Sequence, residues 1–320
     1  MAYSAGDTIL DDEYNTFVNS SSDPYGYNHF AGTGALQYGL GQSAISTVSA
    51  GGTVQASQWN SLFTGLDNIA NHTNDSITAS SVSAGDTIAI RSALVADLAS
   101  LAAEVAGGST SATALTTSSA LATVTTSSEG WNATATQEVK ATFSNANEMR
   151  WFFNAGGKLR LTVGATASST SAKDTAFVAL GTGIGNLDLG SQATTRSGAS
   201  QATTTSGLTN GFYDLGTSYT SLLKLTQNSY AAYNSNTVEV FAKLNASPGS
   251  ATELTFKMVA TDPASDTQYT GGNVDGVPSA IKDTPKMVST LFSINPTTAQ
   301  GLDPVYTPAS GAQVSNSTTD

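Results

Sequence analysis

The chain's two histidines are the first candidates for chemistry. His29 and His72 have the ring nitrogens that metal sites and general bases use, but no carboxylate cluster with ligand spacing lies near either one in the sequence. A Ser-His-Asp system needs a base positioned beside the serine, and the many serines include no Gly-x-Ser-x-Gly elbow. We therefore expect structural roles for both histidines and no hydrolytic triad.

Three acidic or glycine-rich motifs resemble sites without completing one. The stretch GTGIGN, residues 181–186, lacks the last glycine of a dinucleotide-binding turn and the Lys-Ser/Thr of a phosphate loop, so we expect a plain turn. Asp262, Asp266 and Asp275 share an oxygen-rich loop that leaves a calcium site open, although the spacing is not that of an EF-hand. The adjacent acidic residues 11–13 would point to different faces of a helix, which favours N-terminal dipole compensation over catalysis.

The composition excludes several classes of protein. Charged residues make up 11% of the 320 residues, against roughly 25% in soluble globular proteins. The net charge of −12 argues against a nucleic-acid partner, because nucleic-acid affinity depends on neutralising phosphates with Lys and Arg. The chain has no Cys, no apolar window long enough for a membrane span, and a start that lacks the pattern of a signal peptide. We predict a non-enzymatic protein without a cofactor.

A short unit is repeated near the N-terminus. The hexamers SAGDTI, SAGGTV and SAGDTI begin at residues 4, 49 and 83, and each carries turn-forming residues ahead of a helical pattern. The first two are followed at the same distance by Tyr14-Asn15 and Trp59-Asn60, whereas the third has lost this pair. We expect three turn-helix units, of which the third caps the set.

The apolar residues that follow each turn have helical spacing, which predicts amphipathic helices. Helices shorter than about 12 to 15 residues are marginal alone in water, so these must pack on each other or on a partner chain. We therefore assign an assembly role to the apolar face of the first two units: Tyr14, Phe17, Trp59, Leu62, Phe63 and Leu66.

Beyond about residue 120 the apolar spacing changes to alternation, which is typical of strands. In EMRWFFNAGGKLRLTVG, residues 148–164, Met149, Trp151 and Phe153 would share one face, and the strand would return after a turn at NAGG. This pattern predicts a hairpin. Further alternating segments at 238–244, 254–260 and 287–294 predict an antiparallel sandwich.

The predicted fold is α+β, with four regions along the chain. Residues 1–106 form a small helical repeat module for assembly or anchoring, and residues 107–120 a linker. Residues 121–296 form an antiparallel, jelly-roll-like β-sandwich, and residues 297–320 a polar tail that is extended or disordered.

The repeated hexamers, QYGLGQ at 37–42 and RWFFNAGGKLRL at 150–161 together resemble virion structural proteins of tailed phages, notably cyanophages. The resemblance is close over residues 4–75 and 139–165 and extends to 230–295 in pattern only. It brings no catalytic residues with it.

The resemblance implies a structural part of the virion, made in the host cytoplasm, of the neck or tail fibre type. Its implied partners are copies of itself and other virion proteins of the portal, neck, tail or capsid. A capsid decoration protein is one alternative. Another is a receptor- or glycan-binding module that contacts a host surface glycan through loops at 165–210 and 262–282, and a bacterial surface or matrix protein is a third.

Overall fold

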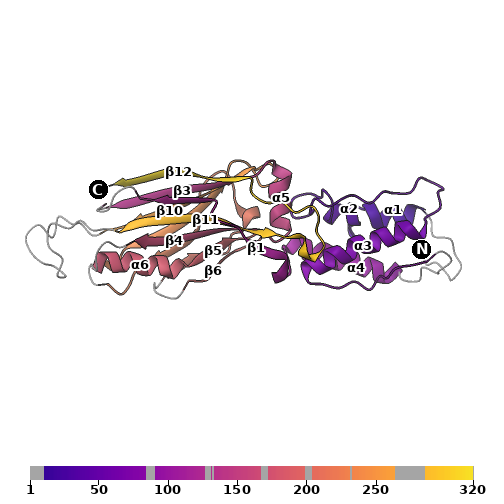
Figure 1. The fold of residues 1–320 in the computed structure, drawn as a ribbon, viewed down its shortest axis with the longest axis horizontal. Coiled ribbons are helices and arrows are strands. Elements are labelled where there is room, and N and C mark those ends of the chain that lie inside the picture. The colour runs from indigo at the N-terminus through magenta and orange to yellow at the C-terminus, as the bar shows by residue number, and fades with distance from the viewer. Residues whose placement is uncertain are drawn as a thin grey trace, which may run out of the picture. The chain divides into compact units, whose positions relative to one another are not determined.

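The computed structural model describes residues 11–83, 91–126, 131, 133–166, 172–198, 204–230, 233–263 and 285–319. Within them the chain is mixed helix and strand with two antiparallel sheets, so the α+β class is confirmed (Figure 1). The chain divides into two compact units. The helical unit comprises residues 1–116, 147–157 and 295–307, and the sheet unit comprises 117–146, 158–294 and 308–320. The contiguous division that we predicted is wrong in this respect, because three separate stretches build each unit.

Helices make up most of the helical unit: α1 (Asp11–Asn19), α2 (Tyr27–Phe30), α3 (Ala56–Thr73) and α4 (Arg91–Gly107). The acidic residues 11–13 form the first turn of α1, where negative charge favours the helix dipole, as predicted. At the start of α3 the Gln58 side chain accepts a hydrogen bond from the Gln55 N–H, and the helix ends at Asn74 in the left-handed conformation. The helices pack on one another around a shared apolar core.

The predicted hairpin over residues 148–164 is wrong in its first half. Residues Ala146–Asn154 form helix α5, and only the second half is a strand, β4 (Lys158–Thr166). The apolar residues of this stretch fit both periods, since Met149, Phe152 and Phe153 also have the i, i+3, i+4 spacing of a helix. All three are fully buried, which decides for the helix.

The strands of the sheet unit form two sheets. The first sheet has the order β1-β11-β4-β5-β6, with β2 also paired to β11, and the second has the order β12-β3-β10-β9-β8-β7. The strands of the first sheet are β1 (Leu115–Thr117), β2 (Ala122–Thr125), β4, β5 (Asn186–Leu189), β6 (Thr194–Arg196) and β11 (Lys286–Pro296). Those of the second are β3 (Thr134–Thr142), β7 (Thr204–Gly207), β8 (Thr220–Thr226), β9 (Thr237–Leu244), β10 (Glu253–Thr261) and β12 (Ser310–Thr319). Helix α6 (Ala172–Ile184) precedes β5.

The two sheets meet through their buried faces. Gln137 of β3 is 1% exposed, and its amide donates to the Met287 carbonyl of β11 at 2.8 Å and accepts from the Ser289 hydroxyl at 2.6 Å. The jelly-roll connectivity is not confirmed, because β8, β9 and β10 follow one another both along the chain and across the sheet.

Two regions expected to lack structure contain regular elements. Residues 310–319 form β12, an edge strand that pairs with β3 along its whole length, although both faces of β12 are polar. Backbone hydrogen bonds suffice to hold such a strand, and its side chains give no apolar alternation to detect. Within the predicted linker, residues 112–114 form the 3-10 helix η1 and residues 115–117 form β1. Two more 3-10 turns lie at η2 (Phe212–Asp214) and η5 (Thr298–Gln300).

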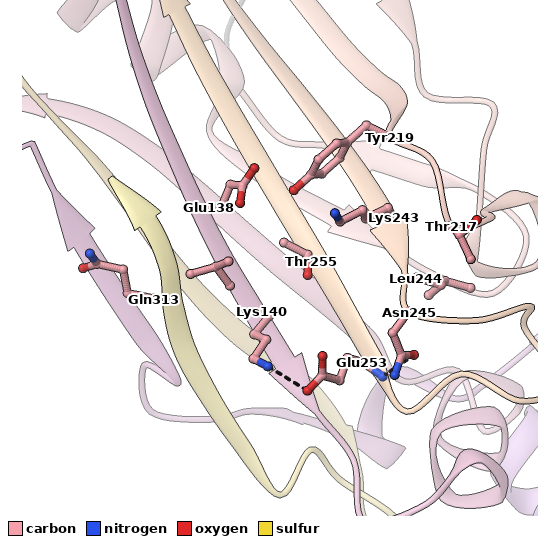
Figure 2. A pocket seen from close by; sticks show the side chains of 11 residues that line it. Glu138, Lys140, Thr217, Tyr219, Lys243, Leu244, Asn245, Glu253, Thr255 and Gln313 are labelled. Atoms are coloured by element: carbon pink, nitrogen blue, oxygen red, sulfur yellow. Dashed lines mark hydrogen bonds and ion pairs between the residues drawn. The ribbon is translucent and has the colours of Figure 1, made fainter. Parts of the chain in front are cut away.

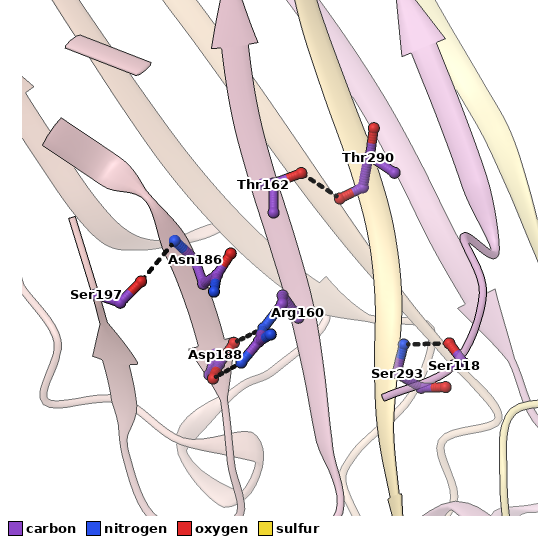
Figure 3. A network of polar contacts seen from close by, with 8 residues as sticks. All are labelled: Ser118, Arg160, Thr162, Asn186, Asp188, Ser197, Thr290 and Ser293. Atoms are coloured by element: carbon purple, nitrogen blue, oxygen red, sulfur yellow. Dashed lines mark hydrogen bonds and ion pairs between the residues drawn. The ribbon is translucent and has the colours of Figure 1, made fainter. Parts of the chain in front are cut away.

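Polar contacts cross the outer face of the first sheet (Figure 3). Arg160 of β4 binds Asp188 of β5 through two nitrogens, at 2.6 and 2.8 Å, in a bidentate pair. The hydrogen bond from Arg160 to Asp188 raises the pKa of the Arg160 guanidinium above its ordinary value. The ion pair links the neighbouring strands β4 and β5, and each charge is neutralised by the other.

Candidate functional site

The six residues assigned to assembly lie in the core of the helical unit. Each is 0 to 5% exposed, and Trp59 of α3 packs edge-on against Tyr14 of α1 with their ring centroids 5.2 Å apart. Side chains this deeply buried are not available for direct contact with a second chain. The assignment of Tyr14, Phe17, Trp59, Leu62, Phe63 and Leu66 as contact residues is therefore wrong, and their periodicity reflects packing of the helices on each other.

The asparagines that follow Tyr14 and Trp59 make the same kind of contact. Asn15 donates its amide to the Val48 carbonyl at 2.8 Å and accepts from the Val48 N–H at 2.7 Å. Asn60 makes the same two bonds with Val82, at 2.9 and 2.8 Å. Each valine stands directly before the next SAG sequence, so the side chain of one helix fixes the entry to the following unit.

The repeats themselves are described only in part. The second hexamer forms a turn in which the Gly52 N–H bonds to the Ser49 carbonyl at 2.8 Å and Gly51 is left-handed. Residues 1–10 and 84–90 lie outside the described residues, so the first hexamer and most of the third are not available for comparison. In α4 the position equivalent to Asn60 is Leu94, which is buried. The asparagine contact is therefore made from α1 and α3 and has no equivalent at this position of α4.

Both histidines have structural surroundings. His72 is fully buried and shares a hydrogen bond of 3.0 Å between Nε2 and the Ala155 carbonyl, while His29 stacks on Tyr25 with the ring centroids 4.2 Å apart. Burial lowers the pKa of both, and for His72 the bond to Ala155 partly offsets it. Among the residues that the structure describes, no group of three or more His, Asp or Glu side chains is placed to hold a metal ion.

Of the three aspartates in the loop where a calcium site was considered, the structure describes only Asp262. Asp262 is buried and pairs with Lys173 of α6, with Nζ and Oδ2 2.6 Å apart. Asp266 and Asp275 lie outside the described residues. The turn expected over GTGIGN is wrong for most of its length, because residues 181–184 end α6 and residue 186 begins β5. Only Gly185, which is left-handed, lies between the two elements.

Helix α5 binds a loop of the helical unit through side chains that donate to backbone carbonyls. Arg150, 5% exposed, donates to the carbonyls of Thr33 and Tyr38. Asn154, 1% exposed, donates to three carbonyls within residues 36–39, at 2.8 to 3.1 Å. The loop cannot satisfy these carbonyls by itself, so it depends on a helix more than 110 residues away in the sequence.

A pocket of about 530 Å³ lies on the outer face of the second sheet (Figure 2). The floor is Thr255 of β10, which is flanked in register by Lys140 of β3 and Lys243 of β9. Tyr219 stands beside Lys243, and the Lys140–Glu253 pair lies on the other side of Thr255. Further lining comes from hydroxyl, amide and aliphatic groups: Thr217, Leu244, Asn245, Gln313 and Val314.

Charges on this face are arranged around one tyrosine ring. The Nζ atoms of Lys243 and Lys257 lie 4.4 and 4.1 Å from the Tyr219 centroid. Lys257 is also 4.7 Å from the Phe241 ring. Burial, and after it the nearby Glu138 carboxylate, raises the pKa of Tyr219 above its ordinary value, so the phenol stays protonated at neutral pH. The face therefore offers two ammonium groups, a phenol and several uncharged polar groups.

Sequence reasoning missed this face. Lys140, Lys243 and Lys257 were visible only as the polar positions of alternating strands, which any solvent-facing sheet would show. The available signal is that a chain with only 12 Lys and Arg residues has one on each of three strands, but the strand order that makes them neighbours is not written in the sequence.

Comparisons with protein-family models, curated proteins and solved structures find no match for this chain. Within the described ranges, none of the helices has the length and apolar character needed to cross a membrane.

Proposed function

We propose that the chain is a non-enzymatic structural component of a bacteriophage virion, a neck or tail fibre protein that self-assembles and attaches through its helical unit. The sheet unit, as a β-sandwich, is displayed outward. The proposal rests on the resemblance of the repeated hexamers, QYGLGQ and RWFFNAGGKLRL to virion proteins of tailed phages.

One observation carries the proposal. The QYGLGQ loop at 37–42 and the RWFFNAGG stretch at 150–157 bind each other directly, through Arg150 and Asn154, and belong to the same unit as the described repeat helices. The resemblance therefore concerns one folded module instead of scattered segments.

The low charge supports a role in an assembly. Serine, threonine and asparagine hydrate a surface with little like-charge repulsion, which suits copies of one chain packed side by side. We expect a homo-oligomer with closed symmetry, the arrangement that most assemblies of identical chains adopt. Light scattering on the purified chain should give a mass that is a multiple of the 32.5 kDa protomer. A monomer at all concentrations would count against self-assembly.

The position in the particle is tested by immunogold labelling. Antibodies raised against the purified chain are applied to intact virions of the phage whose genome encodes it, with particles of an unrelated tailed phage as the control. Label at the neck or tail is expected. Label over the head would favour the capsid decoration alternative, and particles that bind no antibody and whose mass spectra lack the chain's peptides would overturn the virion proposal.

A receptor- or glycan-binding module remains the second candidate. The observation that favours it is the polar pocket on the second sheet, which is separate from the loops at 165–210 and 262–282 where the sequence directed attention. Its ligand is considered next.

A further inference from the structure

We propose that the pocket on the outer face of the second sheet binds a saccharide that carries a carboxylate. Lys243, which lines the pocket, and Lys257, which does not line it but contacts the Tyr219 ring, would hold the acid group. The proposal does not depend on the virion assignment, and its test uses the purified chain alone.

The size of the pocket fits a ligand of one to three sugar rings. Ligand pockets for small molecules run from about 300 to 1,000 Å³, and this one has a volume of about 530 Å³. It lies on the exposed face of a continuous sheet, so its floor is held by the backbone pairing of β3, β10 and β9. A rigid floor needs little reorganisation when a ligand binds.

Two lysines near Tyr219 favour the binding of an anion. Lys140 is paired with Glu253 at 2.7 Å, and Lys224, on the same face, lies 3.6 Å from Glu239. Among the described residues, Lys243 and Lys257 have no carboxylate within ion-pair distance and contact aromatic rings instead. Two ammonium groups within 4.4 Å of one ring centroid repel each other, and a carboxylate bound at this ring would relieve the repulsion.

The remaining lining selects for hydroxyl groups. The Thr255 hydroxyl at the floor and the Gln313 amide at the β12 side can each donate and accept, which matches the paired donor and acceptor character of a sugar hydroxyl. The Glu138 carboxylate is a further acceptor, and its charge disfavours a second acid group next to the first. The chemistry therefore favours a single carboxylate on a hydroxylated ring over a polyanion.

The test measures binding of carboxylated and neutral sugars by isothermal titration calorimetry at low salt. The carboxylated probes are trigalacturonate and sialyllactose, and the methyl ester of sialyllactose is the neutral match for the second. Binding of at least one carboxylated probe is expected, with the methyl ester at least about tenfold weaker than sialyllactose, since bonds to a charged group contribute about 1.5 to 3 kcal/mol. Affinity should fall as salt is added.

The variants K243Q and K257Q each remove one ammonium group and keep a polar side chain of similar length. Each should weaken binding of the carboxylated probe about tenfold. The matched control K224Q makes the same change on the same face, outside the pocket, and should alter affinity less than twofold. Thermal melting of the three variants checks that the sheet unit stays folded.

Four outcomes would overturn the proposal. They are failure of both carboxylated probes to bind, equal binding of sialyllactose and its methyl ester, binding of inorganic sulfate as tight as that of the saccharide, and an equal loss in K224Q. Sulfate competition separates a saccharide site from a simple anion site. None of these results bears on whether antibodies label the virion, so the two proposals fail separately.

Discussion

At the residue scale, substituting two left-handed glycines by alanine distinguishes the cost of backbone strain from the cost of steric crowding. Gly41 has φ +70° and a Cβ there would lie 2.5 Å from the Tyr306 ring and 2.6 Å from the Trp151 ring, whereas Gly51 has φ +75° with nothing within 4 Å. G51A should cost about 1 kcal/mol of stability through backbone strain alone. G41A should cost a further 1 to 3 kcal/mol, roughly, because the rings must move. Urea unfolding of both variants measures the difference, and equal losses would contradict the tight packing at Gly41.

The buried His72 makes stability depend on pH. Burial lowers its pKa in the folded chain, so between its ordinary value of about 6.5 and the lowered value the unfolded chain binds a proton that the folded chain does not. The free energy of unfolding is therefore full above about pH 6.5 and falls as the pH drops toward the folded pKa.

The variant H72Q keeps an amide near the Ala155 carbonyl and cannot titrate. Chemical unfolding at pH 7.5 and pH 5 should show a smaller drop in stability for H72Q than for the wild-type chain. His29 contributes to the drop equally in both proteins, so the difference isolates His72. A drop of the same size in both would show that His72 is accessible to protons in the folded state.

At the scale of elements, the asparagine contacts carry the connection between turn-helix units. N60A removes both bonds to Val82 and leaves that valine's backbone N–H and carbonyl without this partner. The expected loss is about 1 to 3 kcal/mol. The control is N71A on the same helix, where Asn71 is exposed and makes a single bond of 3.2 Å to Asp67. Thermal melting should leave N71A within about 0.5 kcal/mol of the wild type. If N71A lost as much stability as N60A, the loss would come from a general effect on α3 and not from the two hydrogen bonds between Asn60 and Val82.

Several elements could be predicted from the sequence because one period dominates them. In α3 the apolar residues fall on one helical face, and in β9 and β10 they alternate strictly, so local pattern and burial agree. Helix α5 could not be predicted in this way, because its aromatic run satisfies both periods and only burial and the distant contacts of Arg150 and Asn154 distinguish them. Strand β12 has no apolar face, and its position is determined by backbone pairing with β3.

The candidate site shows the same limit. The apolar faces of α1 and α3 were visible in the sequence, but a periodic face does not reveal whether its partner is the same chain or another, and burial shows that it is the same chain. The pocket at Tyr219 joins side chains from three strands whose order follows from sheet pairing over more than 100 residues. Patterns within one segment carry no information on such pairing.

At the scale of the whole molecule, the chain crosses between the units several times. Residues 147–157 and 295–307 leave the order of the sheet unit and complete the helical unit. A boundary drawn at one point of the sequence therefore cuts through both. The linker predicted at residues 107–120 contains η1 and β1, and one of the crossings between the units falls inside it, between residues 116 and 117.

The crossing predicts how fragments behave. The fragment 121–296, the sandwich expected from sequence, lacks β12 and the carbonyls of residues 33–39 to which the buried Arg150 and Asn154 donate in the whole chain. It should aggregate or unfold without a sharp transition, because β3 becomes an unpaired edge strand and two buried polar side chains lose carbonyls to which they donate. The comparison is residues 117–320 with 147–157 and 295–307 replaced by Gly-Ser linkers. It retains the strands from β2 to β12 except for the last two residues of β11, and it removes those two later stretches of the helical unit. Circular dichroism melting should show a cooperative transition for this second protein only. A cooperative transition in 121–296 would mean that the sheets fold without β12 and without the contacts of α5. The division into interleaved units would then make no measurable difference to stability.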